Sequence, residues 1–141
     1  MYQKILVALD NSPTDRAMFP HITQLAKVHG SELLLLHVAD GWAARNYNRF
    51  QLADSEEMKE DRAYLEMVAG DLRAQAIEVK THLALGDPPT EILKTAADAA
   101  CDLIAMTTHG HRFLKDLIYG NTITQVRHRA KVPVLLVNAA Q

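Results

Sequence analysis

The sequence contains little that could stabilise a fold other than a hydrophobic core. It has one cysteine, Cys101, in 141 residues, so no disulfide can form within the chain. The lone cysteine, and first residues that lead into a strand pattern without the apolar segment of a signal peptide, predict a cytoplasmic location. No apolar run exceeds the length of a strand, so we expect no membrane span.

The sequence also lacks a strong excess of charge of either sign. Lys and Arg total 15 and Asp and Glu total 17, a formal net charge of −2, so no broad field attracts nucleic acid or an anionic membrane. Hydrophobic residues make up 48% and charged residues 23%, the balance of a soluble globular protein. Length and composition predict a single domain over residues 1–141, with roughly two thirds of the unfolded surface buried.

Five segments have the pattern of strands in a largely parallel sheet. Four are continuous apolar runs, as in strands covered on both faces, and one alternates, as in an edge strand half open to water. Amphipathic or capped segments lie between them, and this alternation predicts a doubly wound α/β layer with right-handed crossovers. The predicted strands are Ile5–Leu9, Glu32–Val38, the alternating Ile77–Ala84, Leu103–Met106 and Val132–Val137.

The first predicted helix has a recognisable beginning and end. Ser12 is placed to cap it, Pro13 to occupy its first position, and Asp15 to return a capping bond. Gly30 should end it. Pro20 should kink the helix or be confined to its early turns.

The stretch Cys101–Thr122 resembles a site around which the rest of the chain is arranged. The strand Leu103–Met106 should end in the loop Thr107–Gly110, and Gly120 should open a helix at Asn121–Thr122. A strand, a loop and a helix N-terminus together expose backbone N–H groups to an anion such as phosphate. On spacing alone, ordinary turn glycines are the simpler interpretation.

The same stretch resembles the phosphate loop of the universal stress protein family. In nucleotide-binding members the loop has the form Gly-x-x-Gly, a spacer as long as residues 111–119, and then Gly-Ser or Gly-Thr. Gly110 and Gly120 match the second and third glycines. Thr107 replaces the first glycine and Asn121 the hydroxyl residue, although a hydroxyl follows at Thr122.

The resemblance extends over nearly the whole chain and carries further implications. It implies a Rossmann-like, adenine nucleotide alpha-hydrolase-type fold, with helices on both faces of a five-stranded parallel sheet in the order 3-2-1-4-5. It implies binding of ATP or AMP, with Mg²⁺ as an accompanying cation, and a homodimer that pairs through residues 132–137. Gly86, Pro88 and Ile92 resemble the family's loop before its third helix.

Ten positions are predicted to contact the nucleotide. Asp10 follows the first strand, where ligands of open parallel sheets bind, although it could instead cap its own turn. The resemblance places Asp10 near adenine and ribose, and the backbone of Val38 against the adenine ring. The predicted positions are Ala8, Asp10, Val38, Met106, Thr107, Gly110, His111, Gly120, Asn121 and Thr122.

Histidines near the loop suggest a metal site, but their surroundings do not support one. His109 and His111 flank a glycine, and the carboxylates or cysteines that would complete a zinc site are missing nearby. We therefore predict no metal site and no catalytic residues, and we expect His37 to be a hydrogen-bonded residue at a strand end. Residues 40–54 combine Trp, Tyr and Phe with arginines. They are predicted to form a lid or a partner-facing flap, the alternative being stacking on single-stranded nucleic acid.

Three functions remain open from the sequence. The first is a regulatory protein of the universal stress type that binds an adenine nucleotide without turnover and has an unidentified protein partner. The second is a slow ATP hydrolase that uses the same loop with Mg²⁺. The third is a dimeric interaction module that binds no nucleotide, an alternative that Thr107 and Asn121 keep open.

Overall fold

The computed structural model describes residues 1–39, 56–108 and 116–139, and for residues 116–120 it describes the backbone path alone. Predictions that concern residues 40–54, Gly110 and His111 therefore lie outside the described residues. The elements, in chain order, are β1 (Lys4–Ala8), the 3₁₀ helix η1 (Pro13–Ala17), α1 (Phe19–His29), β2 (Glu32–Ala39), α3 (Glu56–Arg73), β3 (Glu78–Leu85), α4 (Pro88–Asp98), β4 (Leu103–Thr108), α5 (Asp116–Arg129) and β5 (Val134–Asn138).

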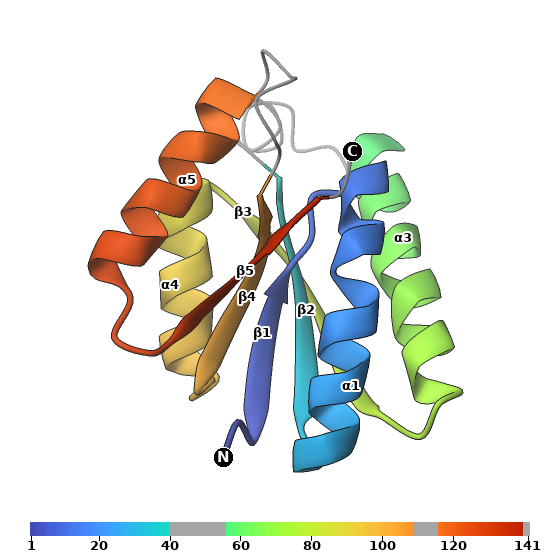
Figure 1. Ribbon diagram of the computed structural model, residues 1–141. Helices are drawn as coiled ribbons and strands as arrows, with labels where there is room; N and C mark the ends of the chain where they lie inside the picture. Colours follow the sequence, from blue (N-terminus) through green and yellow to red (C-terminus); the bar gives the residue numbers. More distant parts are fainter. Residues whose placement is uncertain (40–55, 109–115, 140–141) are drawn as a thin grey trace.

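The described strands form one parallel sheet in the order β3-β2-β1-β4-β5, which confirms the predicted fold class and strand order. Helices α1 and α3 cover one face, and α4 and α5 cover the other (Figure 1). The chain runs outward from β1 to β3 on the first side and then returns to β4, which is the other neighbour of β1. The direction of winding thus reverses between β1 and β4, where ligands of doubly wound sheets bind beyond the carboxyl ends of the strands.

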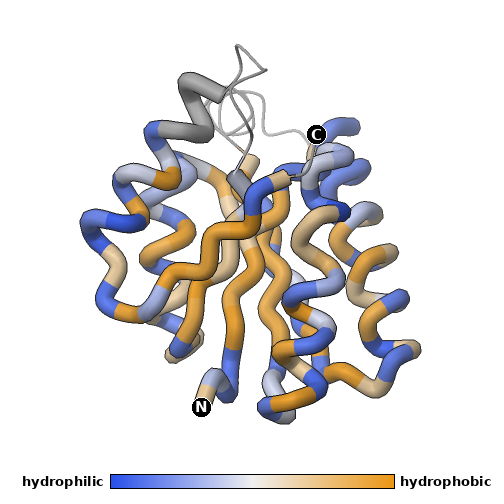
Figure 2. The backbone as a smooth tube through the Cα atoms, viewed as in Figure 1, coloured by the Kyte–Doolittle hydropathy of each residue, from blue (hydrophilic) through white to orange (hydrophobic). Residues whose placement is uncertain are grey.

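Alternating side chains of the central strands fill two separate cores. Ile5 and Val7 of β1 are fully buried against α1 and α3, whereas Leu6 is fully buried on the side of α4 and α5. In Figure 2 the strands are predominantly hydrophobic, and each helix alternates between hydrophobic and hydrophilic stretches. Because a sheet covered on both faces needs apolar residues at every position, the continuous apolar runs were a reliable signal.

The segment after β1 differs from its prediction in one detail. Ser12 occupies the N-cap position of η1, but its hydroxyl donates to Asp10 rather than accepting from the helix backbone. A 3₁₀ turn precedes α1, so Pro20 is the second residue of α1 and lies in its first turn, where a missing N–H removes no intrahelical bond. Gly30 ends α1 in the left-handed conformation, as predicted.

The prediction that Gly120 opens a helix is wrong. Helix α5 begins at Asp116, so Gly120 is an internal helical residue and Asn121–Thr122 is not a helix N-terminus. A glycine inside a helix costs only about 1 kcal/mol relative to alanine, which tertiary packing readily overrides. The last strand also begins two residues later than predicted, at Val134, because Pro133 supplies no ladder N–H.

Over residues 1–39, 56–108 and 116–139, no helix combines the length and the apolar composition that a bilayer crossing requires.

Candidate functional site

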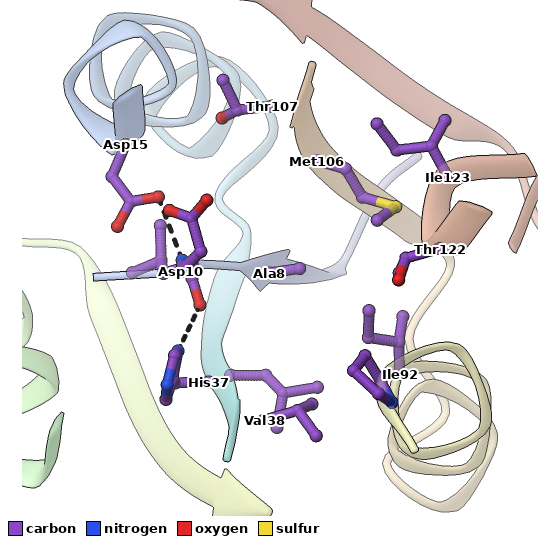
Figure 3. A pocket seen from close by; sticks show the side chains of 13 residues that line it. Ala8, Asp10, Asp15, His37, Val38, Ile92, Met106, Thr107, Thr122 and Ile123 are labelled. Atoms are coloured by element: carbon purple, nitrogen blue, oxygen red, sulfur yellow. Dashed lines mark hydrogen bonds between the residues drawn. The ribbon is translucent and has the colours of Figure 1, made fainter. Parts of the chain in front are cut away.

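A pocket opens at the carboxyl ends of β1, β2 and β4, where the winding of the sheet reverses. Its lining comes from these three strands, from the loop after β1, and from the sides of α4 and α5. Figure 3 shows it from close by, with carboxylates on one side and apolar side chains on the other. The lining residues are Ala8, Leu9, Asp10, Asp15, Leu36, His37, Val38, Pro88, Ile92, Met106, Thr107, Thr122 and Ile123.

The apolar wall of the pocket is part of the core that α4 and α5 share with the sheet. Ile92 of α4 and Met106 of β4 are 4% and 5% exposed, and Val38 and Ile123 pack against the same core. Asp87 positions α4 here, because its side chain accepts the backbone N–H of Thr90 at the helix N-terminus. This wall can bury a flat or apolar group without leaving a polar atom unpaired.

The polar wall consists of Asp10 and Asp15. The carboxylate of Asp15 accepts the backbone N–H groups of Asp10 at 3.1 Å and Asn11 at 2.9 Å. Asp10 in turn accepts the hydroxyl of Ser12 at 2.8 Å. Asp10, considered from the sequence as a cap of its own turn, is not the residue that accepts these two N–H groups. It is Asp15 that satisfies the N–H groups of this turn, and Asp10 lines the pocket.

Asp15 is only 1% exposed, and its environment disfavours a charge. Burial raises the pKa of Asp15 to about 7, and the adjacent Asp10 carboxyl adds to the increase. The hydroxyl of Tyr64, which donates to Asp15 Oδ2 at 2.7 Å, opposes that increase. The same burial and the Asp15 carboxylate raise the pKa of Tyr64, so this hydroxyl remains a donor.

A second hydrogen-bonded group connects α3 to the pocket. Asp61 of α3, 5% exposed, accepts the side-chain amide of Asn11 at 2.9 Å and lies 3.3 Å from Nε2 of His37. The other ring nitrogen of His37 contacts the carbonyl oxygen of Leu9 at 2.8 Å. His37 is therefore a hydrogen-bonded residue at a strand end, as predicted, and it ties β2 to the loop after β1.

Two hydroxyls also line the pocket. Thr122 of α5 is buried, at 6% exposure. The Oγ1 atom of Thr107 is inaccessible to solvent and has no hydrogen-bond partner among the described residues. In Figure 3 this oxygen lies on the side of the two carboxylates. An unpaired buried hydroxyl costs about 1–3 kcal/mol, so this atom is suited to receive a partner from a ligand.

The structure brings together six of the ten predicted contact residues: Ala8, Asp10, Val38, Met106, Thr107 and Thr122. Asn121 is exposed and is not among the residues that line the pocket, and Gly120 lies within α5. Asp15 and His37 line the pocket but were not predicted to. Pro88 and Ile92 also line the pocket, and the sequence singled them out through their resemblance to the family's loop before its third helix.

The charges of the lining restrict what the described part of the pocket can bind. None of its lining residues is Lys or Arg, and two are aspartates. Over residues 1–39, 56–108 and 116–139, no three His, Cys, Asp or Glu side chains gather in a way that could hold a metal ion. The arrangement suits a neutral group with hydrogen-bond donors on one side and an apolar face on the other.

Together, the fold and the pocket define a doubly wound α/β protein with a pocket at the reversal point of its sheet. The chain belongs to the universal stress protein family, whose characteristic sequence pattern it matches over residues 1–138.

Individual relatives match over most of their length. Universal stress protein MJ0577 of Methanocaldococcus jannaschii is 29% identical, with 97% of this chain and 95% of the relative covered. A solved structure of MJ0577 superimposes with a TM-score of 0.81 and covers 100% of this chain and 99% of its own. Universal stress protein YxiE of Bacillus subtilis is 28% identical, with 97% of this chain and 99% of the relative covered.

Two solved universal stress proteins share the fold at lower identity and contain nucleotides. One from Archaeoglobus fulgidus, in complex with dAMP, has a TM-score of 0.72 at 19% identity and covers 96% of this chain and 98% of its own. Another, in complex with cAMP, has a TM-score of 0.71 at 18% identity and covers 99% and 98%. These likenesses show the shared fold.

Proposed function

We propose that this protein is a regulatory universal stress protein that binds an adenine nucleotide, with the nucleoside in the pocket between β1 and β4. The observation that carries the proposal is the two-sided lining, with a carboxylate wall facing an apolar wall at the reversal point of the sheet. A nucleoside has a flat base with an apolar face and a sugar with hydroxyl donors, so it complements both walls.

Different residues of the described pocket would contact the base and the ribose. Val38, Ile92 and Met106 would contact the base, with the backbone of Val38 at its polar edge. Asp10 would accept hydrogen bonds from ribose hydroxyls, and Thr107 would pair its free hydroxyl with the ligand. The dAMP and cAMP complexes of proteins with this fold support an adenine nucleotide as the ligand class.

The phosphates would lie outside the described part of the pocket. Two aspartates and no lysine or arginine line the described pocket, so a phosphate is disfavoured there by charge repulsion. By the family resemblance Gly110 and His111, which lie outside the described residues, would contact the phosphates, and any Mg²⁺ would accompany ATP rather than bind to the two aspartates.

Binding without turnover is the activity that we propose, in the cytoplasm and with a protein partner that reads the bound state. Hydrolysis would need a general base beside a phosphate-bound water. The two carboxylates that line the described pocket, those of Asp10 and Asp15, would lie beside the nucleoside and not beside its phosphates. A slow ATP hydrolase is therefore the second candidate. A dimeric interaction module without nucleotide is the third, and the unpaired Thr107 hydroxyl argues against it.

We also propose a homodimer through β5. In the described sheet β5 pairs only with β4, so its other edge is open, and Val134, Leu135 and Leu136 are only partly buried. A two-fold pairing of this edge would close without forming fibres. Sedimentation at tens of micromolar should show a dimer, and a monomer that does not change with concentration would exclude it.

The nucleotide proposal is tested on the purified protein. Denaturation followed by mass spectrometry of the supernatant identifies any nucleotide that copurifies. Titration calorimetry then compares adenosine, AMP and ATP. We expect adenosine to bind, because its contacts lie in the described pocket, and absence of binding by all three would refute the proposal.

Asp10→Ala tests the assignment within the pocket. It should weaken adenosine and ATP by similar factors, about tenfold, because a charge-assisted hydrogen bond is lost from the nucleoside. Asp71→Ala is the matched control, since Asp71 is exposed on α3. A loss seen with ATP but not with adenosine would move Asp10 to a phosphate or metal role.

A further inference from the structure

Asp15 is placed to control the geometry of the site, whereas the sequence predicted only a capping bond from it at the start of the first helix. It is almost fully buried, it lines the pocket, and its two oxygens accept hydrogen bonds from three donors. Two of the donors are the consecutive backbone N–H groups of Asp10 and Asn11. The third is the hydroxyl of Tyr64, which reaches the site from α3, 49 residues further along the chain.

We propose that Asp15 is a positioning residue for the nucleoside site, and that Asp15 and Asp10 hold one proton between them while the ligand is bound. This inference rests on the proposed function and adds that ligand binding is linked to proton uptake. The proton comes from solvent, and no covalent bond is made or broken.

The positioning role follows from the backbone that Asp15 holds. Asn11 has a φ of 57°, in the left-handed region that residues other than glycine seldom adopt. The Asp15 carboxylate offsets this cost by accepting the consecutive N–H groups of Asp10 and Asn11. The turn fixes the direction of Asp10, so loss of the Asp15 acceptor would release the side chain that lines the pocket.

The proton is inferred from the charges that surround Asp15. Asp10 faces it from the end of β1 and Tyr64 faces it from α3. Arg16, the next residue in η1, is exposed and lines the outer groove between α1 and α3 rather than the pocket. No other described cation lines the pocket except His37 if it is protonated, and His37 is paired with Asp61.

The ligand increases the repulsion between the two carboxylates. A nucleoside in the pocket replaces water beside Asp10 and brings no positive charge, so the repulsion grows as the local dielectric constant falls. One shared proton removes that repulsion and leaves Asp10 able to accept from the ligand. Burial and the Asp10 carboxyl already raise the pKa of Asp15 to about 7 without ligand, so the proton is available near neutrality.

The test is calorimetric titration of the unmodified protein with adenosine, which does not itself titrate between pH 5.5 and 8.5. Measurements at each pH in two buffers of different ionisation enthalpy count the protons taken up. Affinity should be nearly constant up to pH 6.5 and then fall by about tenfold or more by pH 8.5, with proton uptake approaching one. Constant affinity and no proton uptake would overturn the inference.

Three variants assign the proton to a residue. Asp15→Asn keeps an oxygen for Asn11 and Tyr64 but places its nitrogen against the Asp10 N–H, so it removes the titrating group and loses one hydrogen bond of the turn. It should bind adenosine with the same affinity at pH 6.5 and pH 8.5, more weakly than the unmodified protein at pH 6.5 and without proton uptake. Asp15→Ala leaves the N–H groups of the turn without their acceptor and should bind more weakly than Asp15→Asn at every pH.

Asp61→Asn tests whether the proton is taken up by Asp15 or by Asp61 and its partner His37. If it abolishes the pH dependence, the proton belongs to the His37–Asp61 pair and the inference is overturned. Asp71→Asn, on the exposed face of α3, should keep the unmodified profile. The two proposals fail differently. Adenosine binding with constant affinity refutes only the proton linkage, whereas no adenosine binding at any pH refutes both.

Discussion

The two walls of the pocket are built in different ways. On the side of α4 and α5, Ile92 and Met106 belong to a continuous apolar core. On the side of α1 and α3, the polar wall of Asp10 and Asp15 is supported by further polar groups, the buried Asp61 and the partly buried Tyr64 and His37. The apolar wall depends on contact area alone, whereas the polar wall depends on every donor having its acceptor.

This difference bears on how each wall tolerates change. An apolar wall responds to substitution in proportion to the volume removed, and neighbouring side chains can relax into part of the space. A hydrogen-bonded wall responds to single atoms and to pH, because one lost partner leaves a buried group unsatisfied. We therefore expect stability to depend on both walls and pH sensitivity to depend on the polar one.

The largest loss of stability is expected from Ile92→Ala in the apolar wall. Removing most of a 4% exposed side chain from the core should lower the free energy of unfolding by about 3 kcal/mol. Val28→Ala on the exposed face of α1 is the control, with a change of less than about 0.5 kcal/mol. Urea denaturation measures both, and equal losses would show that the wall is not packed as described.

Asp61→Ala should destabilise the polar wall by about 2 kcal/mol, because Asn11 and His37 both lose their partner. Asp71→Ala, also on α3 but exposed, should have almost no effect. The same denaturation measurement compares them. A loss from Asp61→Ala no greater than that of the control would mean that the network contributes nothing to stability.

The dependence of stability on pH should come from Asp15. Its pKa in the folded protein, about 7, is above the unfolded value of 3.8, so the folded state binds more protons between these values. Stability should therefore fall as pH rises through this window, by about 1–2 kcal/mol from pH 5.5 to 7 for this group alone. Asp15→Asn should remove that part of the decline, and an unchanged difference between the two pH values would contradict the assignment.

The smallest expected effect concerns Thr107, which lies between the two walls. Thr107→Val replaces a buried unpaired hydroxyl by a methyl group of similar size, so the free protein should gain up to about 1 kcal/mol. Adenosine should then bind several-fold more weakly, because the ligand loses a partner. Thr108→Val is the control, since its hydroxyl already donates to Asn138 and its loss should not stabilise the protein.

A stability gain without any loss of affinity would show that the Thr107 hydroxyl faces the pocket but contacts no ligand.

The amino-acid sequence alone determined the layer architecture. Continuous apolar runs predicted strands covered on both faces, and the alternating pattern before Gly86 predicted an edge strand, which β3 is. Pro13, Pro20 and Gly30 marked the limits of the first helical segment through restrictions that act within a few residues. Together with the family resemblance, such local signals sufficed for the strand order and for six of the thirteen residues that line the pocket.

Only the tertiary structure decided which polar groups meet. Tyr64 reaches Asp15 across 49 residues and Asn11 reaches Asp61 across 50, and both contacts depend on how α3 packs on the sheet. The start of α5 at Asp116 likewise overrides the local preference of Gly120. Hydrophobic patterning fixes which face of an element is buried, but a hydrogen bond needs atoms placed to within a few tenths of an ångström, which only the assembled packing provides.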